Sequence, residues 1–425
     1  MYLTCKGKNA CFFILTENTQ FIKECFIIDA ILASVCRFSG SLAPVRTDDL
    51  AAWVIKKLLE RHTDLPSDAF DDVILGCANQ AGEDNRNVAR MALLLAGLPF
   101  TVPGETVNRL CASGMSAVIH AHRAIQTGDG DLFIAGGVEH MTRGPWVISK
   151  TSRPFGNDAE MHDSSFGWRF VNPKMHKLFG TDAMGETAEN LVAKYNINRE
   201  DQDKFAHWSQ MKAAEAQRNG RFSEEITPVE IPQRKGDPIL FKLDEFIRPE
   251  TTLEVLAKLK TAFKKESDGG TVTAGNASGL NDGAAAMLVA SGTAVKTHNL
   301  KPLARIVASG VAGVEPRMMG IGPVFATEKA LNKAGLTLDD MDIIEINEAF
   351  AAQVLACTRM WGIADDDPRI NPNGGAIAIG HPLGMSGTRI LQTAALELHR
   401  QNRRYALVTM CIGVGQGYAT IIEKV

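Results

Sequence analysis

Three glycine-containing segments of this chain carry residues that can form covalent bonds or move protons. Cys111 lies in VNRLCASGMSA (107–117), His381 in NPNGGAIAIGHPLGMSG (371–387) and Cys411 in TMCIGVGQG (409–417). Glycines of this kind let the backbone approach a ligand closely. Two cysteines with one histidine suit covalent acyl transfer combined with proton abstraction at carbon.

Each of these three residues is a candidate for a catalytic role, and each has a purely structural role as the alternative. Cys111 is the candidate nucleophile, and the helix that follows it predicts a lowered thiol pKa; a small buried core residue is the alternative. His381 is the candidate base because imidazole titrates near neutral pH, and a turn residue before Pro382 is the alternative. Cys411 is the candidate second acid and base, and a core cysteine at a strand end is the alternative.

Polar groups that can hold an oxyanion accompany the three residues. The amides around Gly413 can form an oxyanion hole. Asn347, in NEAF, can orient a water or a carbonyl, and it also suits a helix N-cap. Glu348 beside it suits a functional and a structural role equally. The run GNASG with NDG (275–283) can follow an extended ligand or form a plain turn.

The chain contains a diverged internal duplication. DVILGC (72–77) resembles DIIEIN (342–347), and CASGMSA (111–117) resembles HPLGMSG (381–387); both pairs are offset by 270 positions (342 − 72 and 381 − 111). Apolar runs at 73–75 and 132–135 predict buried strands, and residues 116–125 and 388–398 predict helices. The alternation predicts α/β layers, in which a pseudo-twofold axis brings the loops of Cys111 and His381 face to face.

Composition excludes several classes of protein. The chain has 425 residues, a formal net charge of -4 and eight cysteines without a CxxC pair. Such a charge predicts no nucleic-acid or anionic-membrane partner. The scattered cysteines predict no zinc site or disulfide framework and favour a reducing compartment, so we expect a cytoplasmic enzyme. No apolar run has the length of a membrane span.

The domain limits follow from the repeat and from a different stretch between its two copies. Residues 141–270 are richer in charge and irregular sequence, and they predict an inserted lid or ligand-binding domain that includes a polar helix over 199–217. A decorated surface loop is the alternative. The expected units are an extension (1–24), a first half (25–140 plus 271–295), the insertion (141–270) and a second half (296–425).

Together these residues resemble the thiolase family from about residue 25 to residue 425. The motifs that carry the resemblance contain Cys111 (VNRLC), Phe350 (NEAF), His381 (GHP) and Cys411 (CIG). The resemblance implies the thiolase fold, an α/β architecture of two similar βαβαβαββ halves in five αβαβα layers with an inserted loop domain. It also implies homodimers or homotetramers, and it implies no metal or prosthetic group.

The resemblance also assigns roles to residues. Cys111 would take the acyl group, His381 would activate it, and Cys411 would move the proton at the α-carbon. One oxyanion hole would use His381 and a water on Asn347, and the other the amides of Cys111 and Gly413. Coenzyme A would bind as a substrate on the loop domain. Arg248 and Ser278 match positions that contact it, and Met184 and Phe350 match positions that line the acyl pocket.

Within the family, the chain is most similar to 3-oxoadipyl-CoA thiolases of aromatic-compound breakdown, through GCANQAGEDNRNVAR (76–90) and GWRFVNP (167–173). The expected reaction is cleavage of 3-oxoadipyl-CoA by coenzyme A to succinyl-CoA and acetyl-CoA. Arg169 is the hypothetical partner of the distal carboxylate. The alternatives are an acetoacetyl-CoA thiolase, a condensing ketosynthase, against which Cys411 argues, and a non-catalytic CoA-binding protein.

Overall fold

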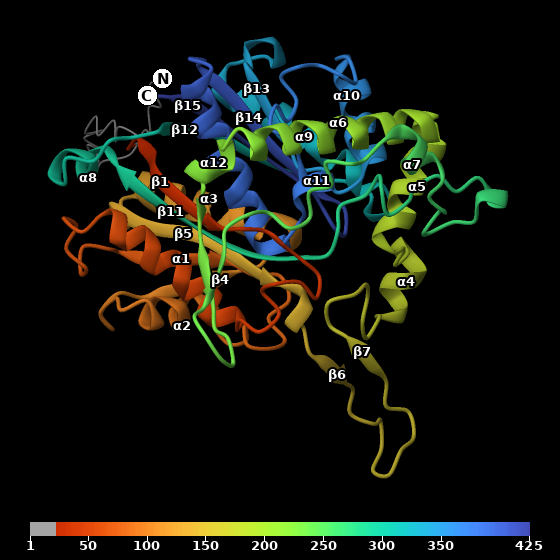
Figure 1. The fold of residues 1–425 in the computed structure, drawn as a ribbon, viewed down its shortest axis with the longest axis horizontal. Helices are drawn as coiled ribbons and strands as arrows, with labels where there is room; N and C mark the ends of the chain where they lie inside the picture. Colours follow the sequence, from red (N-terminus) through yellow and green to blue (C-terminus); the bar gives the residue numbers. More distant parts are fainter. Residues whose placement is uncertain (1–22) are drawn as a thin grey trace, which may run out of the picture.

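The computed structural model describes residues 23–425 (Figure 1). The predicted extension, residues 1–24, therefore lies almost wholly outside the described residues. Eleven strands of the described part form one hydrogen-bonded sheet. Its centre is the antiparallel pair of β1 (Cys25–Ala33) and β12 (Ala304–Gly313), which joins through Phe26 and Ile27 only. The sheet thus consists of two halves with a short seam.

The two halves of the sheet repeat one topology. The strand order is β1-β11-β5-β3-β4 in the first half and β12-β15-β14-β13 in the second. In each half the first two neighbouring pairs are antiparallel and the next is parallel. The remaining strands are β3 (Asp72–Gly76), β4 (Gly104–Val107), β5 (Leu132–His140), β11 (Asn281–Ser291), β13 (Ile343–Ile346), β14 (Tyr405–Ile412) and β15 (Gln416–Lys424). The predicted duplication is confirmed.

Helices cover both faces of each half. α3 (Ser113–Thr127) and α12 (Leu383–Arg400) pack against each other in the middle of the molecule, α3 on β3 and β5 and α12 on β13 and β14 (Figure 1). The outer helices are α1 (Thr47–Arg61) and α2 (Val88–Leu95) on the first half, and α9 (Gly322–Ala334) and α10 (Ala351–Trp361) on the second. Apolar clusters fill each interface, which gives the α/β/α/β/α layering.

The two central helices touch through glycines of the repeated Gly-Met-Ser motif. A Cβ atom on Gly114 would lie 2.5 Å from the Gly384 carbonyl oxygen, and one on Gly387 would lie 2.3 Å from the Met115 nitrogen. Both helices begin earlier than the sequence predicts, because the Gly-Met-Ser turn is itself helical. The two repeated loops, with Cys111 and His381 at their starts, therefore meet at the centre as expected.

The predicted insertion forms a layer of short elements beside the two halves. Its polar helix is α6 (Arg199–Arg218), and its β8 (Ile226–Thr227) extends the sheet by pairing in parallel with the end of β1. The others are β6 (Trp146–Ile148), β7 (Met161–Asp163), α4 (Pro173–Phe179), α5 (Met184–Tyr195), β9 (Val229–Ile231), β10 (Ile239–Phe241) and α7 (Leu253–Ala257). Across residues 23–425, none of the helices has the length and apolarity to cross a bilayer.

The glycine contact between α3 and α12 predicts the effect of a single methyl group. Gly387→Ala should lower the free energy of unfolding by about 1–3 kcal/mol, because the new Cβ overlaps the α3 backbone. Urea denaturation measures this. Gly292→Ala is the control, since its Cβ would meet only Phe26 at an ordinary 3.7 Å. Without a clash, replacing glycine by alanine stabilises a helix. Equal stability of the two variants would therefore contradict the packing argument.

Candidate active site

Cys111 lies in a tight turn between β4 and α3. The residue before it, Leu110, has a left-handed φ of 48°, an uncommon conformation for a bulky side chain. Two side chains hold this turn: Asn108 Oδ1 accepts the Leu110 N–H at 2.9 Å, and Ser113 Oγ accepts the Arg109 N–H at 2.9 Å. The turn places the Cys111 sulfur beside the first turn of α3.

The Cys111 thiol is protonated at rest. Burial raises its pKa to about 11, and the N–H groups of Gly413 and of Cys111 itself, which point at the sulfur, lower it only in part. The prediction of a lowered pKa from the following helix was therefore wrong, because loss of hydration outweighs the amide dipoles in this enclosed turn. A base must remove the proton when a substrate arrives.

His381 is placed as a neutral base. Its Nδ1 lies 2.7 Å from Ser386 Oγ, and that hydroxyl donates to the Pro382 carbonyl at 2.8 Å. Ser386 Oγ therefore accepts, so Nδ1 carries the hydrogen and Nε2 holds the basic lone pair. Burial, and then the positive charge of Arg389, lowers the His381 pKa to about 3.

Asn347 faces the histidine and not a helix end. Its Nδ2 lies 3.4 Å from His381 Nε2. The N-cap alternative was wrong, because α10 begins at Ala351 and Phe350 occupies its N-cap position. Asn347 Oδ1 is buried without a hydrogen-bond partner among the described residues. Buried polar atoms of this kind normally pair with a water or a ligand, so this position fits the predicted water.

Cys411 and Gly413 come from the end of β14 and the turn after it. Cys411 is 1% exposed and packs with Phe350 and Met319. Burial raises its pKa well above the usual range, and the neighbouring Cys111 thiol raises it further. The two thiols are therefore close enough for one negative charge to oppose the other. The turn also aims the Gly413 N–H at the Cys111 sulfur.

The other predicted residues divide into two groups. Met184, at the start of α5, has its sulfur 3.6 Å from where a Gly413 Cβ would lie, and Phe350 shares an apolar cluster with Cys411, so both adjoin the site. Arg248 stacks over Phe246, Ser278 donates its N–H to the Ala349 carbonyl, and Arg169 binds Ser164 and Asn79. Contacts among the described residues do not join these last three side chains to the two thiols.

Several neighbours of the site were not singled out from the sequence. Ser386, which orients His381, occupies the place of Ser116 in the repeat, and this was the available signal. The sequence indicates only a turn at Asn281, but in the structure its Oδ1 accepts the His381 N–H at 2.9 Å. Glu348 ties Ser209, Asn371 and Ile377 together and is structural. The 275–279 run pairs its Ala277 with Phe350.

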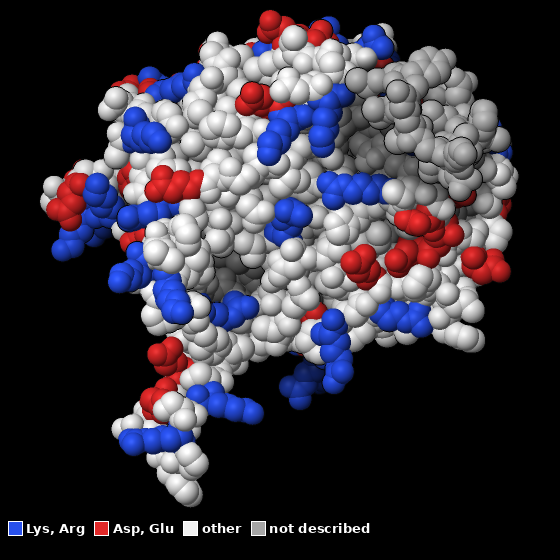
Figure 2. Space-filling model, turned by 180° about the vertical axis from the view of Figure 1, so that it is seen from behind, with Lys and Arg blue, Asp and Glu red and all other residues white. Residues whose placement is uncertain are grey.

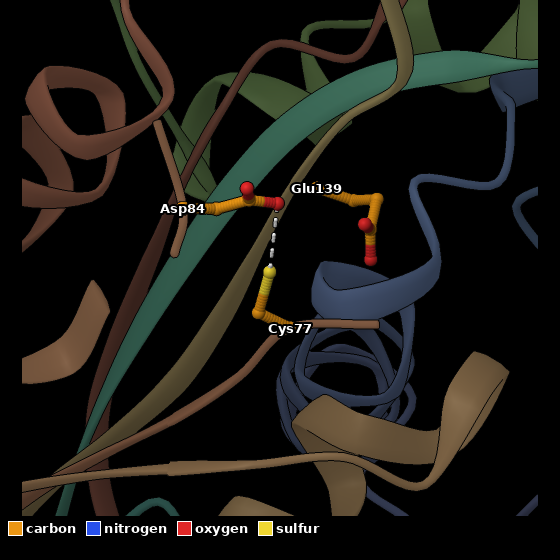
Figure 3. A group of neighbouring side chains, drawn as sticks. All are labelled: Cys77, Asp84 and Glu139. Atoms are coloured by element: carbon orange, nitrogen blue, oxygen red, sulfur yellow. Dashed lines mark hydrogen bonds between the residues drawn. The ribbon is translucent and has the colours of Figure 1, made fainter. Parts of the chain in front are cut away.

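Cys77, Asp84 and Glu139 form a compact buried group with metal-ligand chemistry (Figure 3). Their acceptor atoms are already in use. Glu139 accepts the N–H groups of Ala78, Asn79 and Gly384, and Asp84 accepts those of Gln80 and Gly82 as well as the Cys77 thiol. A metal ion would have to displace these donors, so the group fits a hydrogen-bonded anchor and not a metal centre.

Family models identify the chain. The model described as "Thiolase, N-terminal domain" matches residues 25–293, and "Thiolase, C-terminal domain" matches residues 300–424. The chain belongs to the thiolase family. The layered fold is the thiolase fold, and the chain is an acyltransferase of this family, not a ketosynthase or a non-catalytic CoA-binding protein.

Individual thiolases resemble the chain over nearly its whole length. The "3-oxoadipyl-CoA/3-oxo-5,6-dehydrosuberyl-CoA thiolase" of Escherichia coli is 57% identical, and the alignment covers 95% of this chain and 100% of that protein. The "Beta-ketoadipyl-CoA thiolase" of Acinetobacter baylyi is 56% identical with the same coverage. The structure of human mitochondrial 3-ketoacyl-CoA thiolase superposes with a TM-score of 0.88 at 40% identity, over 95% of this chain and 100% of that one.

The hydrogen bond from His381 to Ser386 predicts a loss of thiolase activity without loss of the fold. Ser386→Ala should lower kcat/KM about tenfold, because Nδ1 loses its acceptor and the imidazole its orientation. Ser116→Ala is the matched control, since Ser116 occupies the same place in the first half and receives only a 3.5 Å contact from Arg109. Equal rates for the two variants would contradict the role of Ser386.

Proposed function

We propose that this thiolase cleaves 3-oxoadipyl-CoA with coenzyme A to succinyl-CoA and acetyl-CoA, a step of aromatic-compound breakdown. The names of the relatives at 56–57% identity support this substrate. The mechanism is supported by two buried, protonated thiols on neighbouring turns and by a buried, neutral imidazole whose loop packs against the start of the helix after Cys111. We also propose that the enzyme acts in the cytoplasm, because its scattered cysteines favour a reducing compartment.

The first half-reaction uses the Cys111 sulfur as nucleophile. His381 Nε2 takes the thiol proton, and the sulfur attacks the C3 carbonyl of the substrate. The negative charge on that oxygen is held by the N–H groups of Cys111 and Gly413, which already converge on the sulfur. The C2–C3 bond then breaks, the acyl group stays on Cys111, and the bonding electrons form the enolate of acetyl-CoA.

Proton transfer completes the cycle. The enolate oxygen is held by His381 Nε2, which now carries a proton, and by a water on Asn347 Oδ1. Cys411 donates its proton to the C2 carbon and releases acetyl-CoA. The Cys411 thiolate then deprotonates the thiol of coenzyme A, which attacks the acyl-enzyme. The acyl-CoA product leaves, and the Cys111 sulfur recovers its proton from His381.

Coenzyme A is proposed to bind between the inserted loop domain and the two thiolase halves. The domain limits are those of the sequence prediction: 25–140 with 271–295, 141–270 and 296–425. Arg248 and Ser278 are proposed as CoA contacts, and Met184 and Phe350 as walls of the acyl pocket. On one face, Lys and Arg side chains border a hollow in the body above a projecting hairpin (Figure 2), which suits the phosphates of coenzyme A.

Arg169 is proposed to bind the distal carboxylate of the substrate. It follows β7 in the insertion, and its guanidinium donates to the Ser164 carbonyl at 2.8 Å and to Asn79 Oδ1 at 3.2 Å. A guanidinium has five N–H donors, so the two anchors fix its direction and leave donors for a carboxylate. The anchors thus favour a pre-organised ion pair over a solvated surface charge.

The assembly is proposed to be a homo-oligomer, a dimer or a tetramer, with the β6–β7 hairpin as part of the tetramer contact. The hairpin extends away from the body (Figure 1). Its large apolar side chains are exposed: Trp146 by 74%, Ile148 by 66% and Met161 by 62%. Projecting apolar groups of this size are typical of surfaces that another chain covers, and a second copy of this thiolase is the proposed occupant.

An acetoacetyl-CoA thiolase is the second candidate. The "Acetyl-CoA acetyltransferase" of Chromobacterium violaceum is 47% identical over 94% of this chain. The two candidates differ in kcat/KM for thiolysis of 3-oxoadipyl-CoA and acetoacetyl-CoA. We expect the purified enzyme to favour the dicarboxylic substrate, and equal or reversed preference would return it to the acetyltransferases.

Arg169→Ala tests the basis of that preference. The ratio of kcat/KM for 3-oxoadipyl-CoA over acetoacetyl-CoA should fall about 10- to 100-fold, because one charge-assisted hydrogen-bonded pair is lost. Arg234→Ala, which removes an exposed arginine elsewhere in the insertion, should leave the ratio unchanged. An unchanged ratio in Arg169→Ala would remove this residue from substrate recognition.

A further inference from the structure

Glu139 is a buried carboxylate at the end of β5 with three backbone partners. It is 1% exposed. One oxygen accepts the N–H of Asn79 at 3.0 Å, and the other accepts those of Ala78 at 3.0 Å and Gly384 at 2.9 Å. Ala78 and Asn79 follow β3, whereas Gly384 belongs to the first turn of α12 in the other half. Figure 3 shows Glu139 beside the start of that helix.

The bond to Gly384 supplies a cap that α12 lacks in its own sequence. Pro382 occupies the N-cap position and offers no side-chain hydrogen bond. The free N–H groups and the dipole of a helix start both favour a negative group there. The Glu139 carboxylate reaches the Gly384 N–H because residue 384 is a glycine and the helix start can pack closely on β5. A Cβ atom at this position would lie only 2.3 Å from the Val138 carbonyl oxygen. The first half of the chain thus caps the helix that directly follows the base of the second half.

The same carboxylate is connected to the Cys111 turn. The Ala78 carbonyl accepts Asn108 Nδ2 at 3.0 Å, and Asn108 Oδ1 accepts the Leu110 N–H directly before Cys111. On the other side, Gly384 lies between His381 and Ser386, whose bond sets the imidazole. One side chain therefore contacts both loops of the site through short hydrogen-bonded paths.

We propose that Glu139 is a positioning residue that holds the Cys111 turn and the His381 helix start in register for catalysis. The inference rests on the proposed roles of Cys111 and His381. Three N–H donors meet its two oxygens, so the ionised carboxylate is the form that satisfies them all. A protonated carboxyl would weaken at least one of these bonds, because its hydroxyl oxygen is a poorer acceptor and its O–H needs an acceptor that the surrounding N–H groups do not offer.

This arrangement makes catalysis sensitive to pH near neutrality. Burial raises the Glu139 pKa to about 7, although its three N–H bonds lower it. The titratable groups that face it are Asp84 and Cys77 after β3 and Cys111 before α3, whereas α12 presents backbone N–H groups. Below about pH 7 the protonated form gains population and the register loosens, so activity should fall. His381, with a pKa of about 3, does not produce this limb in the free enzyme.

Glu139→Gln tests the proposal with little change of shape. Its amide NH2 would face backbone donors, so kcat should fall about 10- to 100-fold through misalignment, with KM nearly unchanged. The acid limb near pH 7 should disappear from the kcat profile. Glu139→Asp keeps the charge and should keep the limb. Asp84→Asn is the matched control, since Asp84 binds only its own loop and the Cys77 thiol. It should keep the limb but move it to lower pH, because the Asp84 charge raises the Glu139 pKa.

Alkylation of Cys111 by iodoacetamide provides a readout that needs no substrate. The Glu139→Gln variant should react more slowly than the unmodified enzyme at pH 8, because its base is displaced. A normal limb and a normal alkylation rate in folded Glu139→Gln would overturn the proposal. If that variant does not fold, a kcat profile of the unmodified enzyme without a limb near pH 7 would overturn it. Absence of any thiolysis by the unmodified enzyme would instead refute the proposed function, with the alkylation comparison still valid.

Discussion

The contact between the starts of α3 and α12 is the constraint on which the rest of the structure depends. Gly114 and Gly387 leave no room for a Cβ atom between the two helices, and Gly384 leaves none against β3 and β5, so the backbones of the two halves meet directly. This contact brings the Cys111 turn and the His381 loop, 270 residues apart, to one place. It also buries both residues in the middle layer of the fold, away from bulk water.

Burial at this contact determines the chemical state of the site. Desolvation disfavours charge, and it raises the pKa values of both thiols and lowers that of His381, so all three groups are neutral at rest. A neutral imidazole can accept a proton, and neutral thiols can donate one. The preformed N–H groups of Cys111 and Gly413 then stabilise the negative charge that forms on the carbonyl oxygen when the sulfur attacks.

Much of this could be predicted from the sequence, because the repeat records it. The 270-residue offset indicated two like halves and facing loops, and the motifs indicated the family. The pKa direction of Cys111 was wrong, because a helix start is visible in the sequence and the depth of burial is not. The sequence did not indicate the role of Ser386, which depends on the turn that it shares with His381. It did not indicate that of Glu139 either, because this residue bonds to Gly384, which is remote in sequence. Asn347 was assigned an N-cap alternative because Asn suits both positions.

The central claim is a division of labour between the two thiols, Cys111 for the acyl group and Cys411 for the proton. Intact-protein mass spectrometry after mixing with acetyl-CoA tests it most directly. The account predicts an added acetyl group on Cys111 in the unmodified enzyme and in Cys411→Ser, none in Cys111→Ser, and condensation lost in both variants. An acetyl group on Cys411, or no acetylation in Cys411→Ser, would contradict it.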